Sequence, residues 1–140
     1  MITSYKYKSD IPYSLHDHRI CKIEKIEDSL KIHFENGYVE CKEPYRQVNG
    51  DITIEKVDFD FCFAYLLNYN GNFEKFNGEK MELLDFLEQY KNFSFEVVDE
   101  TYGYNTVVYN GYLSIPKKNN LNELTITIYH FGNIVYETKD

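Results

Sequence analysis

The chain has 140 residues, of which 43% are hydrophobic and 17% aromatic, and its formal net charge is −8. This length fits a single domain, residues 1–140, that buries a sizeable core. The acidic balance, without a segment that gathers Lys and Arg, argues against direct nucleic-acid binding. Such a charge keeps a small protein soluble, which explains it more often, and it would also steer the chain towards a basic protein partner. No apolar run is long enough to span a bilayer and the amino terminus has no export signal, so we expect a cytoplasmic protein that does not associate with membranes.

The aromatic residues are 14 Tyr and 10 Phe, with no Trp. Tyr is enriched at protein interfaces, although a low-GC genome would favour the same composition. The cysteines, Cys21, Cys41 and Cys62, are odd in number and form no C-x-x-C pair. Neither a disulfide framework nor a structural zinc site is therefore expected, which agrees with reduced thiols in the cytoplasm.

The first third of the chain predicts strands. Isoleucines recur every third residue from Ile20 to Ile26, which indicates a bulged strand. Apolar residues then alternate from Leu30 to Phe34, and Asn36-Gly37 separates this run from Tyr38 to Lys42. Asn-Gly between two such runs is typical of a type I′ turn and predicts a β-hairpin.

The most regular stretch is Val57 to Leu67, VDFDFCFAYLL, in which large apolar residues occupy every second position. This alternation predicts a core strand with the large groups on its buried face and Asp58, Asp60, Cys62 and Ala64 on the other. The stretch is longer than a usual strand, so we expect it to be bent or bulged part way.

One helix is predicted, from Glu79 to Lys91. Its apolar residues lie within an arc of roughly 160°, as expected of a helix laid on a sheet. Asn77 is the expected N-cap, and the acidic residues of the first turn suit the helix dipole.

The last third returns to strands, at Phe93–Asp99, Thr106–Ile115, Leu124–Phe131 and Ile134–Thr138. The turn residues His130 to Asn133 predict that the last two of these strands form a hairpin.

Together the elements predict an α+β fold that is mostly β, with about eight strands and one amphipathic helix packed on them. The connections leave little room for crossovers, so we expect a curved antiparallel sheet in the form of a partial barrel or sandwich.

His16-Asp17-His18 is the one local group that suggests a ligand site. In an extended segment the two imidazoles would share a face and hold a divalent ion if a third ligand arrived from elsewhere. Two ligands do not make a metal site, and the alternative is a structural turn in which Asp17 accepts hydrogen bonds from nearby backbone donors. We therefore predict neither a metal site nor a cofactor.

Asp58 and Asp60 would lie about 7 Å apart on one face of the predicted long strand. Such a pair suits acid–base or metal chemistry only in a cleft; otherwise the carboxylates are solvated. Cys62 is interpreted as a packed side chain. Signatures of the large enzyme classes are absent from the sequence. Their absence does not exclude an enzyme, but it favours a non-enzymatic protein.

The segments Leu15 to Ile20, LHDHRI, and Asp28 to Phe34, DSLKIHF, resemble the starts of several small uncharacterised bacterial β-sheet proteins, some of them of the toxin-immunity type. The resemblance covers roughly 25 residues and implies a protein that binds another protein. It implies no catalytic residues.

Three hypotheses follow. The first is a protein-binding module of the immunity or accessory type, a monomer or homodimer with a basic partner. The second is a half-open barrel that holds a small ligand in an aromatic-lined cavity. The third is a hydrolase or metalloenzyme in which His16, His18, Asp58 and Asp60 converge.

Overall fold

The computed structural model describes residues 1–4, 11–68, 77–116 and 122–139. The elements in chain order are β1 (Tyr13–Ser14), β2 (Arg19–Ile26), β3 (Ser29–Phe34), β4 (Tyr38–Glu40), β5 (Gln47–Ile54), the 3₁₀ turn η1 (Phe59–Phe61), β6 (Phe63–Asn68), β7 (Asn77–Glu82), α1 (Leu83–Gln89), β8 (Ser94–Gly103), β9 (Thr106–Ser114), β10 (Asn122–Tyr129) and β11 (Ile134–Lys139).

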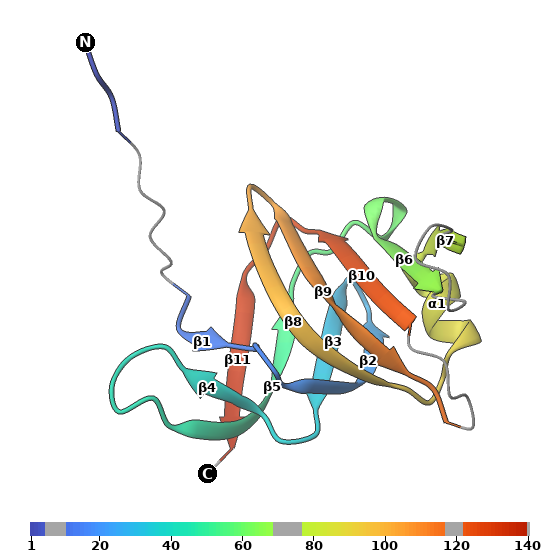
Figure 1. The fold of residues 1–140 in the computed structure, drawn as a ribbon, viewed down its shortest axis with the longest axis horizontal. Helices are drawn as coiled ribbons and strands as arrows, with labels where there is room; N and C mark the ends of the chain where they lie inside the picture. The colour runs from blue at the N-terminus through green and yellow to red at the C-terminus, as the bar shows by residue number, and fades with distance from the viewer. Residues whose placement is uncertain (5–10, 69–76, 117–121, 140) are drawn as a thin grey trace.

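All the strand pairs are antiparallel, in the order β1-β4-β5-β3-β2-β8-β9-β10-β6-β7, with β11 beside β5 (Figure 1). The sheet curves strongly but does not close into a barrel. The predicted fold class, mostly β with a curved antiparallel sheet and one helix, is confirmed.

The core lies on the concave side of the sheet, where the buried apolar side chains form one cluster. Alternation places it there: in β10, Leu124, Ile126 and Ile128 are fully buried while the residues between them are not. The same pattern in β9 buries Val107 and Tyr109.

The predicted bulge in β2 is confirmed. The register of β2 on β3 shifts between Ile20 and Lys22, so Cys21 is the additional residue. The shift explains why Ile20 and Ile23, three residues apart, are both buried; no bulge separates Ile23 from Ile26, so Ile26 lies on the opposite face and is half exposed.

A second bulge lies in β8, between Val97 and Asp99. The opposite strand carries Gly111, where a Cβ atom would lie 1.8 Å from the Glu96 carbonyl oxygen, so only glycine fits this close approach. Because the bulge shifts the alternation by one residue, Glu100 and Tyr102 follow Val97 on the concave side.

The predicted hairpin at Asn36-Gly37 is wrong. β3 pairs with β2 and β5, whereas β4 pairs with β1 and β5. Gly37 does adopt the predicted positive φ, but it lies directly against the Val48 carbonyl, and the chain is redirected there. The hairpin that forms joins β2 to β3 through Glu27 and Asp28, with Glu27 at φ +55.

The predicted hairpin of the last two strands is also wrong. β10 pairs with β9 and β6, and β11 pairs with β5. The turn between them is bound to different neighbours, since His130 N–H donates to the Asn105 carbonyl and Phe131 N–H donates to the Lys56 carbonyl. The turn thus directs β11 to the other end of the sheet.

The predicted long strand is interrupted. Val57 forms an isolated bridge with His130, η1 follows, and only Phe63–Asn68 continues as β6. The expected break is present, but the expected buried face is wrong: Cys62, Ala64 and Leu66 point into the core.

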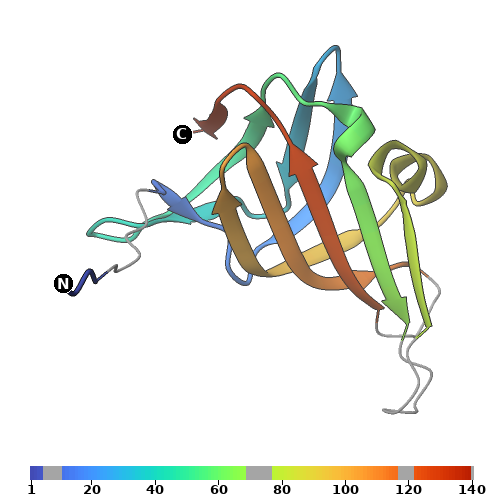
Figure 2. The same cartoon turned by 90° about the horizontal axis from the view of Figure 1, so that it is seen from above.

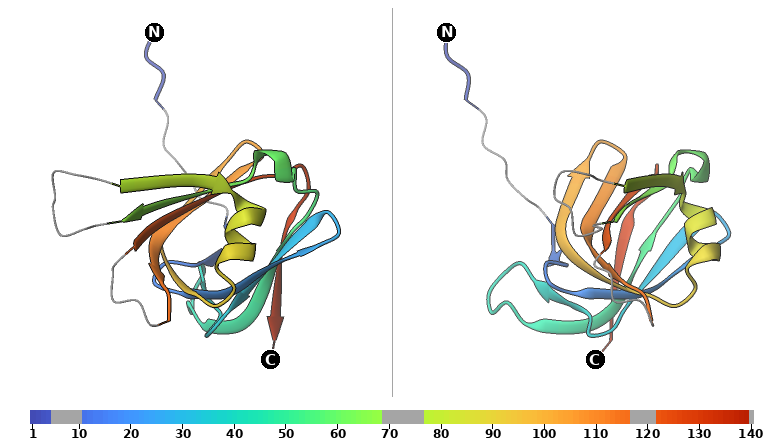
Figure 3. Two further views of the ribbon diagram at one scale, coloured as in Figure 1. Left: turned by 90° about the vertical axis from the view of Figure 1, so that its right-hand side faces the viewer. Right: turned by 45° about the vertical axis from the view of Figure 1, so that its right-hand side comes forward.

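The helix is shorter than predicted. Residues 77–82 form β7 on the edge of β6, so Asn77 is not an N-cap, and Glu82 occupies that position without a side-chain hydrogen bond. α1 packs against β6 and β7 through the buried Leu83 and Phe86 (Figure 3). No helix in the described part of the chain is long and apolar enough to cross a membrane.

Candidate functional site

His16, Asp17 and His18 form a turn and not an extended segment. Asp17 has φ +66, and its N–H donates to the Val97 carbonyl at 2.8 Å while Val97 N–H donates to the His18 carbonyl at 2.9 Å. The segment therefore attaches the start of β2 to β8. The Asp17 carboxylate lies 3.4 Å from His16 Nε2.

The two imidazoles of this turn differ in surroundings. The Val98 carbonyl, which is hydrogen-bonded to His16 Nδ1, and then the Asp17 carboxylate raise the pKa of His16. Burial lowers the pKa of His18. The pair therefore does not present two equivalent ligands.

Asp58 and Asp60 are not paired on a strand face. Asp58 is the N-cap of η1, and its carboxylate accepts a hydrogen bond from Asp60 N–H at 3.2 Å. The main chain of Asp58 is fixed to β10, because its N–H donates to the Tyr129 carbonyl. Cys62 is fully buried and burial raises its thiol pKa, as fits a packed residue.

The five predicted site residues thus belong to two places, the turn on β8 and η1 beside β10. In the part of the chain that the structure describes, no group of three or more His, Cys, Asp or Glu side chains is arranged to hold a metal ion. The structure does not bring the two sets together there.

The convex side of the sheet carries a set of exposed and half-buried rings, three of which, Phe61, Phe63 and Tyr65, the sequence assigned to the core. Because Cys62, Ala64 and Leu66 are buried, the alternating residues of η1 and β6 point outward. β10 lies beside β6 (Figure 2). It adds Tyr129, and the turn after it adds Phe131. We call this set the aromatic face: Phe61, Phe63, Tyr65, Tyr129 and Phe131.

The rings of the aromatic face contact one another in two groups. Tyr129 lies between Phe61 and Phe131, with centroid distances of 6.0 and 5.1 Å, and Phe63 lies 6.5 Å from Tyr65. Phe61 and Phe131 are 60% and 58% exposed, which is unusual for phenylalanine in a folded domain. A contiguous exposed apolar patch of this kind marks an interaction site more often than an isolated exposed ring does.

Charged groups border the aromatic face. The carboxylates are those of Asp58, Asp60, Glu82 and Glu123, and the cations are those of Lys56 and Lys80. The Lys80 ammonium lies 4.1 Å from the Phe63 ring centroid and 5.6 Å from that of Tyr65. Among the described residues the border is therefore acidic on balance, and the Lys80 ammonium contacts the rings through cation–π geometry.

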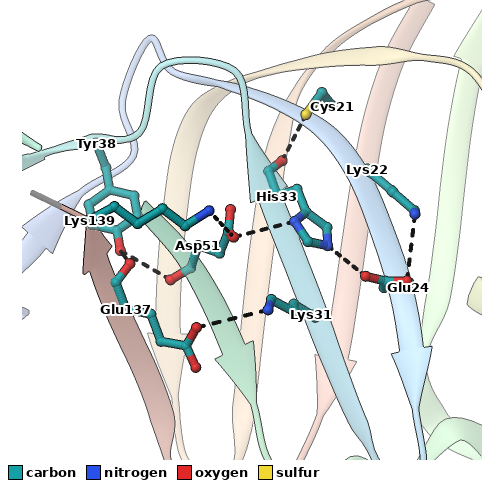
Figure 4. Close-up of polar contacts among 9 residues, drawn as sticks. All are labelled: Cys21, Lys22, Glu24, Lys31, His33, Tyr38, Asp51, Glu137 and Lys139. Atoms are coloured by element: carbon teal, nitrogen blue, oxygen red, sulfur yellow. Dashed lines mark hydrogen bonds and ion pairs between the residues drawn. The ribbon is translucent and has the colours of Figure 1, made fainter. Parts of the chain in front are cut away.

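A polar network lies elsewhere, across β2, β3, β5 and β11 (Figure 4). His33 Nε2 is 2.7 Å from Glu24 Oε1, His33 Nδ1 is 3.4 Å from Asp51 Oδ2, and Lys139 Nζ is 3.3 Å from the same Asp51 oxygen. The Cys21 thiol donates to the main-chain carbonyl of His33, and burial raises its pKa, so no activated thiol–imidazole pair exists here. The network links four strands.

A second enclosed polar group is Glu100, which the β8 bulge turns inward. Its carboxylate accepts hydrogen bonds from Leu15 N–H at 2.6 Å and from the Tyr102 hydroxyl at 3.1 Å, and burial raises its pKa. The fully buried Tyr109 hydroxyl lies near Tyr102, Tyr136 and Glu100. Glu100 thus attaches the segment before β2 to the inner side of β8.

Comparison of the chain with protein-family models, with curated proteins and with solved structures gave no match. Among the described residues, the aromatic face is the feature that indicates a function most directly.

Proposed function

We propose that this protein is a non-enzymatic binding module of the immunity or accessory type that uses its aromatic face to bind another protein. One observation carries the proposal: η1 and β6 turn Phe61, Phe63 and Tyr65 outward while the small Cys62 and Ala64 face the core. Burial of a large apolar side chain contributes roughly 1.5–3 kcal/mol, which is available here only if a partner covers the rings. Aromatic anchors of this kind dominate the energetics of many interfaces.

The charge supports a basic partner. The chain carries a net charge of −8, and carboxylates outnumber ammonium groups at the border of the aromatic face. Complementary charges accelerate association and select the partner, whereas the rings supply most of the affinity. The complex is therefore expected to weaken as the salt concentration rises.

The two alternative functions have less support. A ligand-binding barrel predicts a cavity lined by Phe and Tyr, but the buried side chains of the concave side, Tyr109 and Phe95 among them, pack into one cluster. A metalloenzyme needs its acidic and histidine residues to converge, and the described histidine and aspartate candidates lie on different elements.

The first experiment is a low-salt affinity purification of the tagged protein from its own host, followed by native mass spectrometry. Wild type is compared with the double variant Phe61→Ser/Phe131→Ser. Both positions are more than half exposed, so the fold should survive. We expect wild type to retain a basic protein in stoichiometric amount and the double variant to lose affinity about tenfold or more.

Tyr45→Ser is the matched control, because Tyr45 is 58% exposed and lies in the β4–β5 connection, at the opposite side of the molecule from β6 (Figure 1). It should leave binding unchanged. Equal capture by wild type and the double variant, or a partner retained at high salt as firmly as at low salt, would contradict the proposed use of the face.

A further inference from the structure

An open groove of about 410 Å³ continues the aromatic face at the end of β6 away from η1. Its lining residues are Tyr65, Leu66, Leu67, Gly78, Glu79, Lys80, Glu123 and Thr125. Gly78 contributes no side chain, and a Cβ atom there would meet Leu67 Cδ1 at 3.5 Å, an ordinary contact. The groove is thus a depression at the edge of the sheet with room above the backbone of β7.

The strand register fixes the chemistry of the groove. Leu67 lies between Glu123 of β10 and Gly78 of β7, and Tyr65 is the next outward residue along β6. Directly opposed residues have Cβ atoms about 5 Å apart, and diagonal neighbours about 7–8 Å. An apolar floor, a carboxylate and an exposed ring therefore lie within the reach of one long side chain.

The carboxylate is held in place. Asn110 donates from Nδ2 to Glu123 Oε1 at 3.3 Å and to Thr125 Oγ1 at 2.6 Å. The ammonium of Lys80 lies nearer to Phe63 than to Tyr65, on the side away from Gly78. The chain itself therefore shows that these rings attract a cation, and the groove end is bordered by the Glu123 carboxylate.

We propose that this groove receives an arginine side chain of the basic partner, an inference that rests on the proposed function of the aromatic face. The methylene stem would lie over Leu67, the guanidinium plane on Tyr65, and the guanidinium N–H groups towards Glu123. Arginine is preferred to lysine because its planar group stacks on a ring while its N–H groups still reach a neighbouring carboxylate.

The test uses N-acetyl-arginine amide as the probe in a titration followed by ¹H–¹⁵N NMR. We expect saturable shifts at the amides of Gly78, Leu67 and Thr125, with a dissociation constant in the millimolar range. N-acetyl-citrulline amide, which has the same shape without the charge, should produce shifts at least several-fold smaller.

Three variants locate the binding. Glu123→Gln should weaken it about three- to fivefold, and Glu88→Gln, which removes one exposed carboxylate from α1, should leave it unchanged. Gly78→Val fills the groove, and since its Cβ has space the variant should fold and lose the site-specific shifts. The dispersion of the NMR spectrum of each variant verifies its fold.

Equal shifts with arginine and citrulline probes, or shifts that Gly78→Val does not change, would overturn the arginine site. If the Phe61→Ser/Phe131→Ser variant still loses the host partner in that case, only this inference fails. If the variants change neither the binding of the probe nor the capture of the host partner, the proposed function fails as well.

Discussion

His16 and His18 lie two residues apart, yet their surroundings shift the two imidazole pKa values in opposite directions. A raised pKa means that His16 stabilises the fold below the unfolded value near 6.5, and that this contribution is lost as the pH rises through the folded pKa. His18 has a lowered pKa, so its contribution is present above the unfolded value and is lost as the pH falls through the folded pKa.

We therefore expect an NMR titration of the imidazole Cε1–H signals to give a midpoint above 6.5 for His16 and below 6.5 for His18. Asp17→Asn should lower the His16 midpoint, because the carboxylate is the second contribution to its shift. Identical midpoints for the two residues would mean that the turn does not hold them as described.

Glu100 is a residue at which charge and hydrogen bonding act against each other. Its carboxylate accepts the N–H of the fully buried Leu15, but burial raises its pKa, so the ionised form is disfavoured in the folded state. The folded state therefore gains stability as the pH falls through this raised pKa towards 4.5.

Glu100→Gln keeps an acceptor for Leu15 N–H and removes the charge, so it should be at least as stable as wild type at pH 8. This advantage should shrink at pH 5. Glu100→Ala leaves that N–H without its acceptor and should cost about 1–3 kcal/mol. Urea unfolding at pH 5 and pH 8 measures all three proteins, and a Gln variant as unstable as the Ala variant would show that the charge itself is required.

Among the elements, β6 shows what alternation can and cannot predict. The existence of a strand was predictable from Phe63 to Leu67, but both of its faces are apolar, since Cys62, Ala64 and Leu66 alternate with larger groups. Alternation gives two faces and does not say which of them meets the core. The small residues fit against the packed interior here, so the rings lie outside, and the aromatic face was missed.

The boundary between β7 and α1 was not predictable for a related reason. Glu79, Lys80, Met81 and Glu82 are good helix formers, so propensity alone extends the helix back to Glu79. Pairing with β6 overrides that preference, because residues 77–82 complete an antiparallel ladder along its full length.

β7 also bears on the oligomeric state, because among the described strands it ends the sheet order at one edge. If two copies paired through β7 about a two-fold axis, the two strands would be antiparallel. Two registers pair most of the strand. One places Glu79 opposite Glu79 of the second copy, and the other places Lys80 opposite Lys80. Like charges directly opposed are destabilising. The edge is thus protected against pairing with itself.

We expect the protein to be monomeric by light scattering at micromolar concentration, and Glu79→Thr/Lys80→Thr to favour dimers. A change at Glu88 and Lys91, which lie outside β7, is the control. A dimeric wild type that the double variant leaves unchanged would exclude β7 as the determinant.

At the scale of the whole molecule, the fold class was predictable and the strand order was not. β9 and β10 were correctly placed because their alternating residues are strongly apolar on one face only. The hairpins at Asn36-Gly37 and after His130 failed because turn residues fix a local bend, while pairing is decided by distant strands such as β5 and β11. Of the candidate site, the sequence indicated a turn at His16 and placed Phe131 in a turn, but it assigned Phe61, Phe63 and Tyr65 to the core.

The position of β11 has a consequence for biosynthesis. β11 pairs with β5 in a register that joins Ile134 to Ile54, residues 80 positions apart in the chain. A ribosome that adds about 5–20 residues per second needs roughly 4–16 s to cover that distance. During that interval one edge of the nascent β5 is without its final partner. This unpaired edge is a template on which strands of neighbouring chains on a polysome can pair. The yield of native protein should therefore depend on how closely ribosomes follow one another along the message.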